Sequence, residues 1–378
     1  MAWFADRELR GVVEHVPDVA ATPERLRTPG CWVLVGDFEG RVGAWRFAER
    51  HAPPSGAAGT APAAGTSGPA SPWHGPPPGS WRSSMDEAGY VAGVRDVQAT
   101  IRAGGVYQVN LCRLLVAPLA GGQVEPDARA LGAVLAEGNP APYGGGVHVP
   151  AGSAVPPVWV VSASPELYLR VEDGWVVSAP IKGTARTAEG LTAKDRAENV
   201  MITDLVRNDL QRVCAPGTVE VTTLLGVEQH PGLVHLVSTV RGRLLDPTGY
   251  DLWARLLAAS YPPGSVSGAP KAAALAVIDR LEPVPRGPYC GAVGWVDVAG
   301  DGTVRAELAV GIRTFVWRDG ELRFGTGAGI TWGSDPEAEW RETELKAHRL
   351  IALASCAPHE TGPAEPDRFG APGARLAP

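Results

Sequence analysis

Two pairs of carboxylates in the second half of the chain have a spacing suited to a metal site. Asp195 and Glu198 are three positions apart, as are Glu339 and Glu342. Side chains at i and i+3 share one face of a helix, so each pair would project from one side of its helix. If the two helices face each other, four carboxylates converge and offer the oxygen ligands that Mg²⁺ prefers. Two separate acidic faces exposed to water have the same spacing and are the alternative interpretation.

Lys182 and Glu166 have the residue types needed for covalent and acid chemistry. Lys182 follows an apolar segment and is flanked by Ile181 and Gly183. In such a turn, desolvation disfavours the ammonium form of an unpaired lysine, and the neutral amine is a nucleophile. Glu166 opens an apolar segment, and a buried carboxyl there would keep its proton, as a general acid must. A charge at the edge of a strand is the alternative interpretation of Glu166.

Two glycine-rich segments could bind an anion through backbone N–H groups. Residues 325–329 read Gly-Thr-Gly-Ala-Gly after a predicted strand and could form an anion-binding nest. Residues 264–271 lead into a predicted helix, whose N-terminus favours an anion. Neither segment has the spacing of a nucleotide-binding motif, so ordinary turns are the alternative. His235 lies among apolar residues, where a hydrogen-bonded core histidine is the more common case.

Helices and strands must position these side chains. Apolar residues at helical spacing predict helices at 84–105, 193–210, 270–281 and 335–353. A Ser334-x-x-Glu337 capping box with Pro336 in the first turn marks the start of the last helix. Short apolar segments between turn residues predict strands within 30–49 and at 106–116, 158–162, 166–172, 175–178, 289–297, 304–316 and 321–325. Without regular βαβ alternation, this order predicts an α+β fold of layered antiparallel sheets.

The composition excludes several classes of protein. The 378 residues include 34 Lys+Arg and 41 Asp+Glu, a net charge of −7, with no basic run that would bind nucleic acid. No apolar stretch reaches the roughly 20 residues needed to span a bilayer, and the acidic residues near Met1 do not fit a signal peptide. We therefore expect a cytoplasmic protein without membrane contact. Five scattered cysteines without a CxxC predict buried free thiols.

The composition also divides the chain into four parts. Residues 1–51 form a short β-rich part that we assign to the same fold as the rest. Residues 52–80 are almost entirely Ala, Gly, Pro, Ser and Thr, which cannot bury enough apolar surface to fold, so they are predicted to be a flexible linker. Residues 81–356 hold the candidate site. Residues 357–378 are predicted to be a disordered tail.

The order of the motifs resembles that of the chorismate-utilising enzymes. The matching segments are 107–111, 164–167, 180–184, 197–201 with 204–210, 235–242, 264–271, 289–294 and 334–343. Each is weak evidence alone, but all occur in the order of the family and cover roughly residues 84–353. The resemblance implies two antiparallel β-sheets packed as a sandwich core with helices outside, and a deep Mg²⁺-dependent pocket for chorismate.

The resemblance also implies roles for individual residues. Glu198 and Glu342 correspond to metal ligands, with Asp195 and Glu339 as supporting carboxylates, and Mg²⁺ would hold the ring carboxylate of chorismate. Glu166 corresponds to the general acid that protonates the departing C4 hydroxyl. The implied substrate-binding residues are Gln108, Thr184, His235, Tyr289, Arg313, Gly327, Ala328, Gly329 and Lys346.

Two positions distinguish members of the family. Members that add water to chorismate have a lysine base where this sequence has Gln108, and anthranilate synthases typically have alanine where it has Lys182. In the aminodeoxychorismate synthases, that lysine is the C2 nucleophile. The resemblance therefore implies amination of chorismate at C4 to 4-amino-4-deoxychorismate, for 4-aminobenzoate and folate. The alternatives are an anthranilate synthase component I, which aminates C2, and a catalytically silent subunit that docks a glutaminase.

The sequence also bears on the source of ammonia, and it departs from the family at several positions. No cysteine lies in a Gly-x-Cys-x-Gly motif, so a glutamine amidotransferase subunit is expected to supply ammonia within a heterodimer. Ala185 separates Lys-Gly-Thr from Arg186, and Ser267 stands where threonine is usual. No Leu-Leu-Glu-Ser segment occurs, so we expect no feedback by tryptophan.

Overall fold

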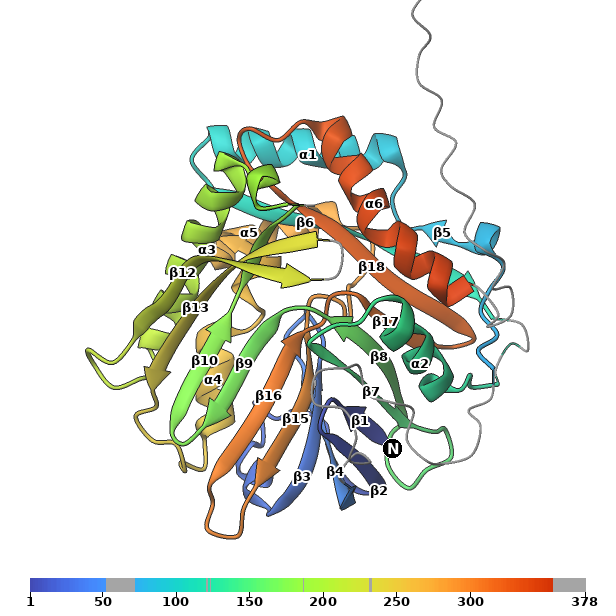
Figure 1. Ribbon diagram of the computed structural model, residues 1–378, viewed down its shortest axis with the longest axis vertical. Coiled ribbons are helices and arrows are strands. Elements are labelled where there is room, and N and C mark those ends of the chain that lie inside the picture. Colours follow the sequence, from blue (N-terminus) through green and yellow to red (C-terminus); the bar gives the residue numbers. More distant parts are fainter. Residues whose placement is uncertain (52–71, 120–121, 123, 186, 231–232, 356–378) are drawn as a thin grey trace, which may run out of the picture.

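The computed structural model describes residues 1–51, 72–119, 122, 124–185, 187–230 and 233–355. In this part of the chain, helices cover a large, strongly curved arrangement of antiparallel strands (Figure 1). The helices are α1 (Glu87–Arg102), α2 (Ala128–Gly138), α3 (Ala193–Gln211), α4 (Leu252–Ser260), α5 (Lys271–Leu281) and α6 (Pro336–Ser355).

The strands alternate with these helices irregularly. In the first half of the chain they are β1 (Ala2–Phe4), β2 (Arg7–Val16), β3 (Gly30–Gly36), β4 (Val42–His51), β5 (Arg82–Ser83), β6 (Gln108–Pro118), β7 (Tyr143–Val149), β8 (Val158–Ser164), β9 (Leu167–Glu172), β10 (Trp175–Ala179) and β11 (Ile181–Ala185). In the second half they are β12 (Glu220–His230), β13 (Leu233–Arg243), β14 (Gly268–Ala269), β15 (Ala292–Val298), β16 (Val304–Val310), β17 (Thr314–Arg318) and β18 (Glu321–Ile330).

The strands form one continuous antiparallel path. Its order is β6, β18, β17, β8, β7, β1, β2, β4, β3, β15, β16, β9, β10 and β13. At one end β5 and β14 pair with β6, and at the other β11 and β12 pair with β13. The α+β class with antiparallel sheets and external helices is thus confirmed, with the sheets joined by hydrogen bonds into one network.

One predicted strand and one glycine-rich segment differ from the structure. The strand expected at 304–316 is divided into β16 and β17, because Arg313 adopts a left-handed backbone with φ of 51°. The glycine-rich segment 325–329, considered as an anion nest, is instead the second half of β18 and pairs with β6. The glycines are needed there because a Cβ on Gly325 would collide with the ring of Tyr289.

The helix starts are fixed by side-chain caps. Thr192 and Asp195 form a capping box at the start of α3. At α6 the predicted cap at Ser334 is wrong by one residue, because Asp335 accepts the hydrogen bond from the backbone N–H of Ala338 at 2.7 Å. Pro336 occupies the first helical position, as expected, where its missing N–H costs nothing.

Packing of these helices on the strands encloses the core. The α6 helix packs on β18 and α1, and α3 packs on β11, β12 and β13. Figure 1 shows α1 and α6 on one side of β6 and β18, at the end of the molecule where α3 also lies. The candidate residues of α3 and α6 are therefore carried to the same end of the molecule, although the two helices pack against opposite ends of the strand path.

The predicted linker and the predicted tail lie largely outside the described residues. Residues 52–71, most of the predicted linker, and residues 357–378, the predicted tail, lie outside the described residues. Trp73 is already part of the core, because it is buried and donates its indole N–H to the carbonyl of Ala354 at 2.7 Å.

Among the described cysteines, Cys112, Cys214 and Cys290 are buried free thiols, as expected, whereas Cys31 is half-buried.

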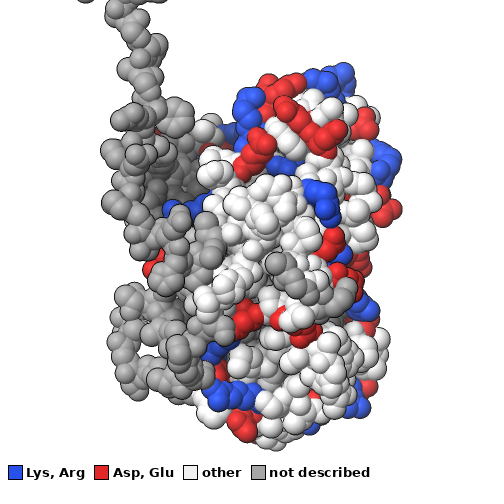
Figure 2. Space-filling view, turned by 90° about the vertical axis from the view of Figure 1, so that its right-hand side faces the viewer, with Lys and Arg blue, Asp and Glu red and all other residues white. Residues whose placement is uncertain are grey.

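The charges on the described surface are mixed. On the described residues of the face in Figure 2, acidic and basic side chains are interspersed without a continuous basic stripe. No helix in the described part of the chain is long and apolar enough to cross a membrane.

Candidate active site

Lys182 lies between the two ends of the strand path. It is the second residue of β11, is half-buried, and its Nζ lies 3.3 Å from the point where a Cβ on Gly329 would stand. The amide Nε2 of Gln108 lies 2.5 Å from the same point. The lysine thus comes from one end of the path, and Gln108 and Gly329 come from the other. A side chain at position 329 would fill the space that the two polar groups share.

The amide of Gln108 is only partly satisfied. The side chain is 1% exposed, and its Oε1 has no hydrogen-bond partner among the described residues. A buried acceptor without a partner costs roughly 1–3 kcal/mol, so a ligand that donates a hydrogen bond here would relieve this cost. Gln108 is therefore suited to contact a substrate beside Lys182.

Glu166 is a buried carboxyl in the short connection between β8 and β9. Burial raises its pKa to about 7, although a hydrogen bond from Ser265 and the charges of Lys182 and Arg313 oppose the shift. A carboxyl with this raised pKa can carry a proton near neutral pH. This is the protonation state that the general-acid prediction requires, and the electrostatic influence of Lys182 places the two groups in one site.

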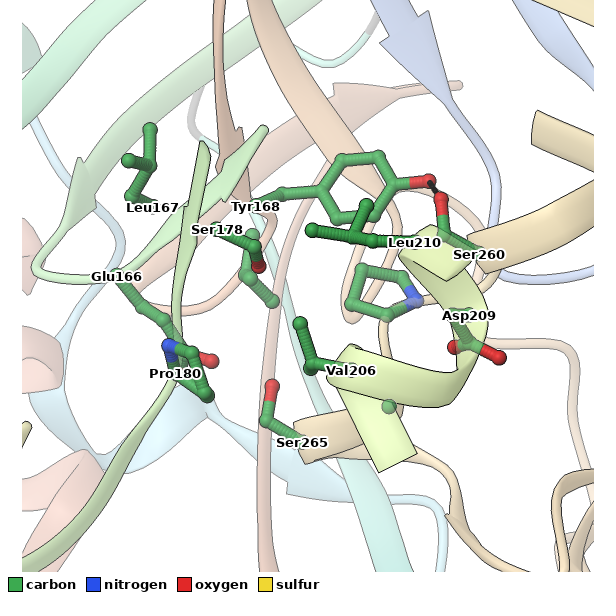
Figure 3. Close-up of a pocket in the computed structure, with 13 residues that line it drawn as sticks. Glu166, Leu167, Tyr168, Ser178, Pro180, Val206, Asp209, Leu210, Ser260 and Ser265 are labelled. Carbon is green, nitrogen blue, oxygen red and sulfur yellow. Dashed lines mark hydrogen bonds between the residues drawn. The ribbon is translucent and has the colours of Figure 1, made fainter. Parts of the chain in front are cut away.

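A small cavity adjoins Glu166 on the side of α3. Glu166 and Ser265 line it together with Val206 and Asp209 of α3 (Figure 3). Its volume of about 20 Å³ is enough for roughly one water-sized molecule. The Tyr168 hydroxyl, hydrogen-bonded to Ser260 at 2.7 Å, closes the far side.

The acidic helices face each other, a point that the spacing alone had left open. Lys194 of α3 makes an ion pair of 2.9 Å with Glu339 of α6, and its Nζ lies 3.7 Å from Oε1 of Glu198. Glu342, one turn after Glu339, pairs with Lys346 at 2.6 Å. The interpretation of two separate solvated acidic faces is therefore excluded for α3 and α6.

The four carboxylates differ in their surroundings. Asp195 serves the helix start, because its Oδ2 accepts hydrogen bonds from the backbone N–H and the hydroxyl of Thr192 at 2.8 and 2.7 Å. Glu339 is buried and bonded to Lys194. Glu198 is nearly buried, and its Oε1 has no hydrogen-bond partner among the described residues.

The surrounding lysines act on these carboxylates differently. Burial raises the pKa of Glu198, against the opposing charges of Lys182 and Lys194. Burial acts in the same direction on Glu342, but there the charge and hydrogen bond of Lys346, with Lys194 and Lys182, outweigh it and lower the pKa. Lys182 thus influences Glu166 at one side of the site and both Glu198 and Glu342 at the other.

The residues present fit a divalent cation. Among the described residues, no group of three or more His, Cys, Asp or Glu is already arranged around one point as metal ligands. However, Mg²⁺ commonly takes only one or two carboxylates and completes its shell with water and substrate. Glu198 offers a buried oxygen without a hydrogen bond, and a positive charge already lies between Glu198 and Glu339.

The other predicted substrate-binding residues lie on β18, on α6 and in the turn before β15. Tyr289 is buried against Gly325, and Cys112 Sγ lies 3.7 Å from its hydroxyl. Lys346 donates to the carbonyl of Gly327 at 3.1 Å, which ties α6 to β18. Ala328 is fully buried, and Gly327, Ala328 and Gly329 all lie opposite β6.

Of the remaining three residues, Thr184 and His235 lie on the paired strands β11 and β13, and Arg313 lies in the bend between β16 and β17. His235 of β13 is 2% exposed and pairs with the backbone of Thr184, whose side chain is outside the described part. Arg313 has an uncommon left-handed backbone, and burial lowers the pKa of its guanidinium, against the charge of Glu166. Such backbone strain is often found at functional sites. Arg186 lies outside the described residues.

Two residues of the site were missed from the sequence. Ser265 was considered only as part of a glycine-rich turn, and nothing in its spacing points to Glu166, which is far away in the chain. Lys194 had a usable signal, because it stands four residues before Glu198 on the predicted helix. Its contact with Glu339, however, depends on how α3 and α6 pack.

The comparison with known proteins identifies the family. Residues 47–352 match the family described as chorismate binding enzymes. Aminodeoxychorismate synthase component 1 of Salmonella typhimurium is 37% identical over 285 residues, which are 72% of this chain and 59% of that protein. Anthranilate synthase component 1 of Thermus thermophilus is 40% identical over 292 residues, which are 73% of this chain and 59% of that protein. The chain therefore belongs to the chorismate binding enzymes, and it spans about three fifths of the length of these curated relatives.

Solved structures of the same fold are also found. A 2,3-dihydroxybenzoate-specific isochorismate synthase from Bacillus anthracis has a TM-score of 0.73 at 24% identity, covering 93% of this chain and 95% of that chain. Anthranilate synthase component I from Streptococcus pneumoniae has a TM-score of 0.72 at 21% identity, covering 92% of both chains. At these identities the likeness shows the fold, and the choice of reaction has to come from the site.

Proposed function

We propose that the chain is the chorismate-aminating component of an aminodeoxychorismate synthase, which replaces the C4 hydroxyl of chorismate by an amino group for 4-aminobenzoate and folate. A glutamine amidotransferase subunit would supply the ammonia. The observation that carries the proposal is the position of Lys182. Its amine lies beside the space above Gly329, and its charge reaches Glu166, Glu198 and Glu342.

Lys182 and Glu166 would divide the first half of the reaction. The neutral amine of Lys182 adds to C2, the ring double bonds shift, and the C4–O bond breaks. Glu166 gives its proton to the departing oxygen, which leaves as water. The result is a ring bound covalently to Lys182 and an ionised Glu166 carboxylate.

The second half reverses the shift of the double bonds. Ammonia adds to C4, and the bond between C2 and the lysine nitrogen breaks, so that Lys182 leaves as a neutral amine. The Glu166 carboxylate then takes a proton from the new ammonium group on C4. Chorismate and ammonia thus give 4-amino-4-deoxychorismate and water, and both side chains return to their starting states.

Other side chains would hold the substrate in place. Glu198, Glu339 and Glu342 are the residues that would hold Mg²⁺, which would supply positive charge for the ring carboxylate. Arg313 and Tyr289 would bind the second carboxylate, since a guanidinium offers bidentate contacts. Gln108 is neutral where a base would be needed to activate water, which favours a nitrogen nucleophile over water.

Anthranilate synthesis is the second candidate, because relatives that carry out each reaction have similar identities to this chain. Incubation of the purified chain with chorismate, Mg²⁺ and ammonium, followed by the lyase that releases 4-aminobenzoate, distinguishes the two. We expect 4-aminobenzoate. Fluorescent anthranilate formed without the lyase would overturn the proposal in favour of C2 amination.

Replacement of Lys182 tests the covalent step. The Lys182→Ala variant should lose C4 amination by about 10³-fold or more, because the nucleophile is absent, while the fold is kept. Product formation is measured by chromatography, and denaturation curves check the fold. Mass spectrometry of the wild type quenched during turnover should detect the ring on Lys182. Unchanged amination by the variant would remove Lys182 from the mechanism.

A further inference from the structure

The ammonium of Lys194 occupies the space between the two acidic helices. Its Nζ is 2.9 Å from Oε1 of Glu339 and 3.7 Å from Oε1 of Glu198. The two carboxylates are largely enclosed, with 4% and 13% of their side chains exposed, whereas 43% of the lysine side chain is exposed. A half-exposed cation therefore neutralises two buried anions that belong to different helices.

The α3 helix itself does not explain why the Lys194 side chain is oriented toward Glu339. Lys194 is the second residue of α3, where the positive end of the helix dipole disfavours a cation. A lysine placed before a glutamate at i,i+4 is also the weaker order of such a pair. The contact with Glu339 on α6 must therefore supply the reason for the orientation of the side chain.

The contact between Lys194 and Glu198 is also incomplete, so another cation could take the place of the lysine ammonium. Oε1 of Glu198 makes no hydrogen bond among the described residues, so Lys194 balances its charge without satisfying the oxygen. A compact cation that takes oxygen ligands would satisfy both carboxylates at shorter distances. The long, flexible lysine stem can turn its ammonium into water at small cost, since it is already half-exposed.

We propose that Lys194 is a built-in substitute cation, which holds α3 and α6 together when no metal is bound and moves into solvent when a divalent cation enters. The inference rests on the proposed function, because it takes Glu198 and Glu339 as residues of the magnesium site. It assigns Lys194 a positioning role: the lysine keeps mutually repelling carboxylates close together and thereby preserves the site for the metal.

Lys271 provides a contrast within the same protein. Its Nζ contacts Asp209 and the carbonyl of Ser260, both at 2.8 Å, and only 17% of its side chain is exposed. Both contacts are of hydrogen-bond length, and the ammonium is largely enclosed. We expect this lysine to stay in place whether or not a metal binds.

The first experiment measures how accessible these lysines are. The purified chain is treated with a trace of acetylating reagent, with and without saturating Mg²⁺, and modification of each lysine is quantified by mass spectrometry. Acetylation of Lys194 should become several-fold faster with Mg²⁺, while that of Lys271 should not change. An unchanged or slower rate at Lys194, or no binding of divalent cations by the wild-type chain, would overturn the inference.

The second experiment separates displacement from a general effect of charge. Lys194→Met and Arg196→Met each remove one positive charge from the first turn of α3, but only Lys194 contacts the two carboxylates among the described residues. Mn²⁺ affinity, followed by the electron paramagnetic resonance signal of free Mn²⁺, should rise at least threefold more in Lys194→Met than in Arg196→Met. Equal gains in the two variants would reduce the effect to net charge and contradict displacement.

Neither experiment requires chorismate, so a failure of the proposed function can be distinguished from a failure of the role of Lys194. Acetylation of Lys194 that responds to Mg²⁺, combined with absence of C4 amination, would overturn the proposed function and leave the role of Lys194 intact. C4 amination combined with a Lys194 that ignores the metal would do the reverse.

Discussion

Two clusters of opposite charges in this protein differ in how completely they are satisfied. Arg286 is buried and donates to both carboxylate oxygens of Glu282, to the carbonyl of Val266 and to that of Asn110, at 2.6–2.9 Å. Glu282 also accepts the backbone N–H of Cys112 at 2.8 Å. In the contacts of Lys194 with Glu198 and Glu339, in contrast, the lysine side chain is half-exposed, and Oε1 of Glu198 has no hydrogen bond among the described residues.

The difference separates charges that serve the fold from charges that serve a ligand. A buried ion pair is stable only when hydrogen bonds satisfy its remaining donors and acceptors, and the surroundings of Arg286 meet this condition. An unsatisfied buried oxygen is a cost that the folded protein carries by itself. We interpret Glu282 and Arg286 as a structural pair, and Glu198 with Glu339 as carboxylates placed for the proposed cation.

Breaking the structural pair should have the largest effect on stability. Arg286→Met should lower the free energy of unfolding by about 3–5 kcal/mol, because it leaves the Glu282 carboxylate buried and unpaired. Chemical denaturation measures this loss. Lys194→Met should cost less than Arg286→Met, since the lysine side chain is half-exposed and water can reach the carboxylates that it leaves.

A double variant tests the reason for that loss. Replacing both partners, as Glu282→Leu with Arg286→Met, should recover part of the stability by removing the uncompensated charge. Equal costs for Arg286→Met and Lys194→Met would contradict the division into a structural and a ligand-binding cluster.

Glu198→Gln tests the other side of the comparison. It should lower the rate of chorismate amination about 100-fold, equivalent to about 2.7 kcal/mol, because a neutral amide is a poor ligand for Mg²⁺. The free energy of unfolding should change by less than about 1 kcal/mol, because Oε1 has no hydrogen bond to lose.

Glu344→Gln provides the matched control for this variant. It changes the same residue type on α6, on an exposed side chain outside the acidic cluster. The control should keep both activity and stability. A Glu198→Gln enzyme that is strongly destabilised, or that keeps full activity, would place Glu198 among the structural charges instead.

The sequence predicted the local elements better than the contacts between them. The helix bearing Glu198 and the helix bearing Glu342 were correct to within a few residues, because apolar periodicity and caps act locally. The spacing of the acidic residues also predicted one face on each helix. That these faces meet, however, depends on the packing of α3 and α6 against strands from distant parts of the chain.

The differences have identifiable physical causes. The left-handed backbone at Arg313 divides a strand that has a continuous apolar pattern, and no local signal marks such a conformation in an arginine. The segment 325–329 was considered as an anion nest or a turn that follows a strand, whereas it continues the strand, and the ring of Tyr289 requires a residue without a side chain at Gly325. Ser265 and Lys194 act through partners far away in sequence, so single-residue patterns could not reveal them.

The last prediction uses Ser265 to sharpen the assignment of Glu166. With a raised pKa of about 7, the carboxyl loses its proton as the pH rises through this value, so the fraction of enzyme in which Glu166 can donate a proton falls about tenfold per pH unit above it. The Ser265 hydroxyl stabilises the ionised form. Ser265→Ala should therefore raise the pKa further and move the limb of the kcat/KM profile that reports Glu166 to higher pH by roughly one unit, the equivalent of about 1.4 kcal/mol.

The conservative variant distinguishes this effect from damage to the fold. Ser265→Thr keeps the hydroxyl and should leave the limb near its wild-type position, whatever its effect on the maximal rate. A Ser265→Ala enzyme that is slower at every pH but has an unmoved limb would mean that the serine only packs. A limb that moves in Ser265→Ala and returns in Ser265→Thr would identify Glu166 as the titrating acid, because its carboxylate receives the hydrogen bond of this hydroxyl.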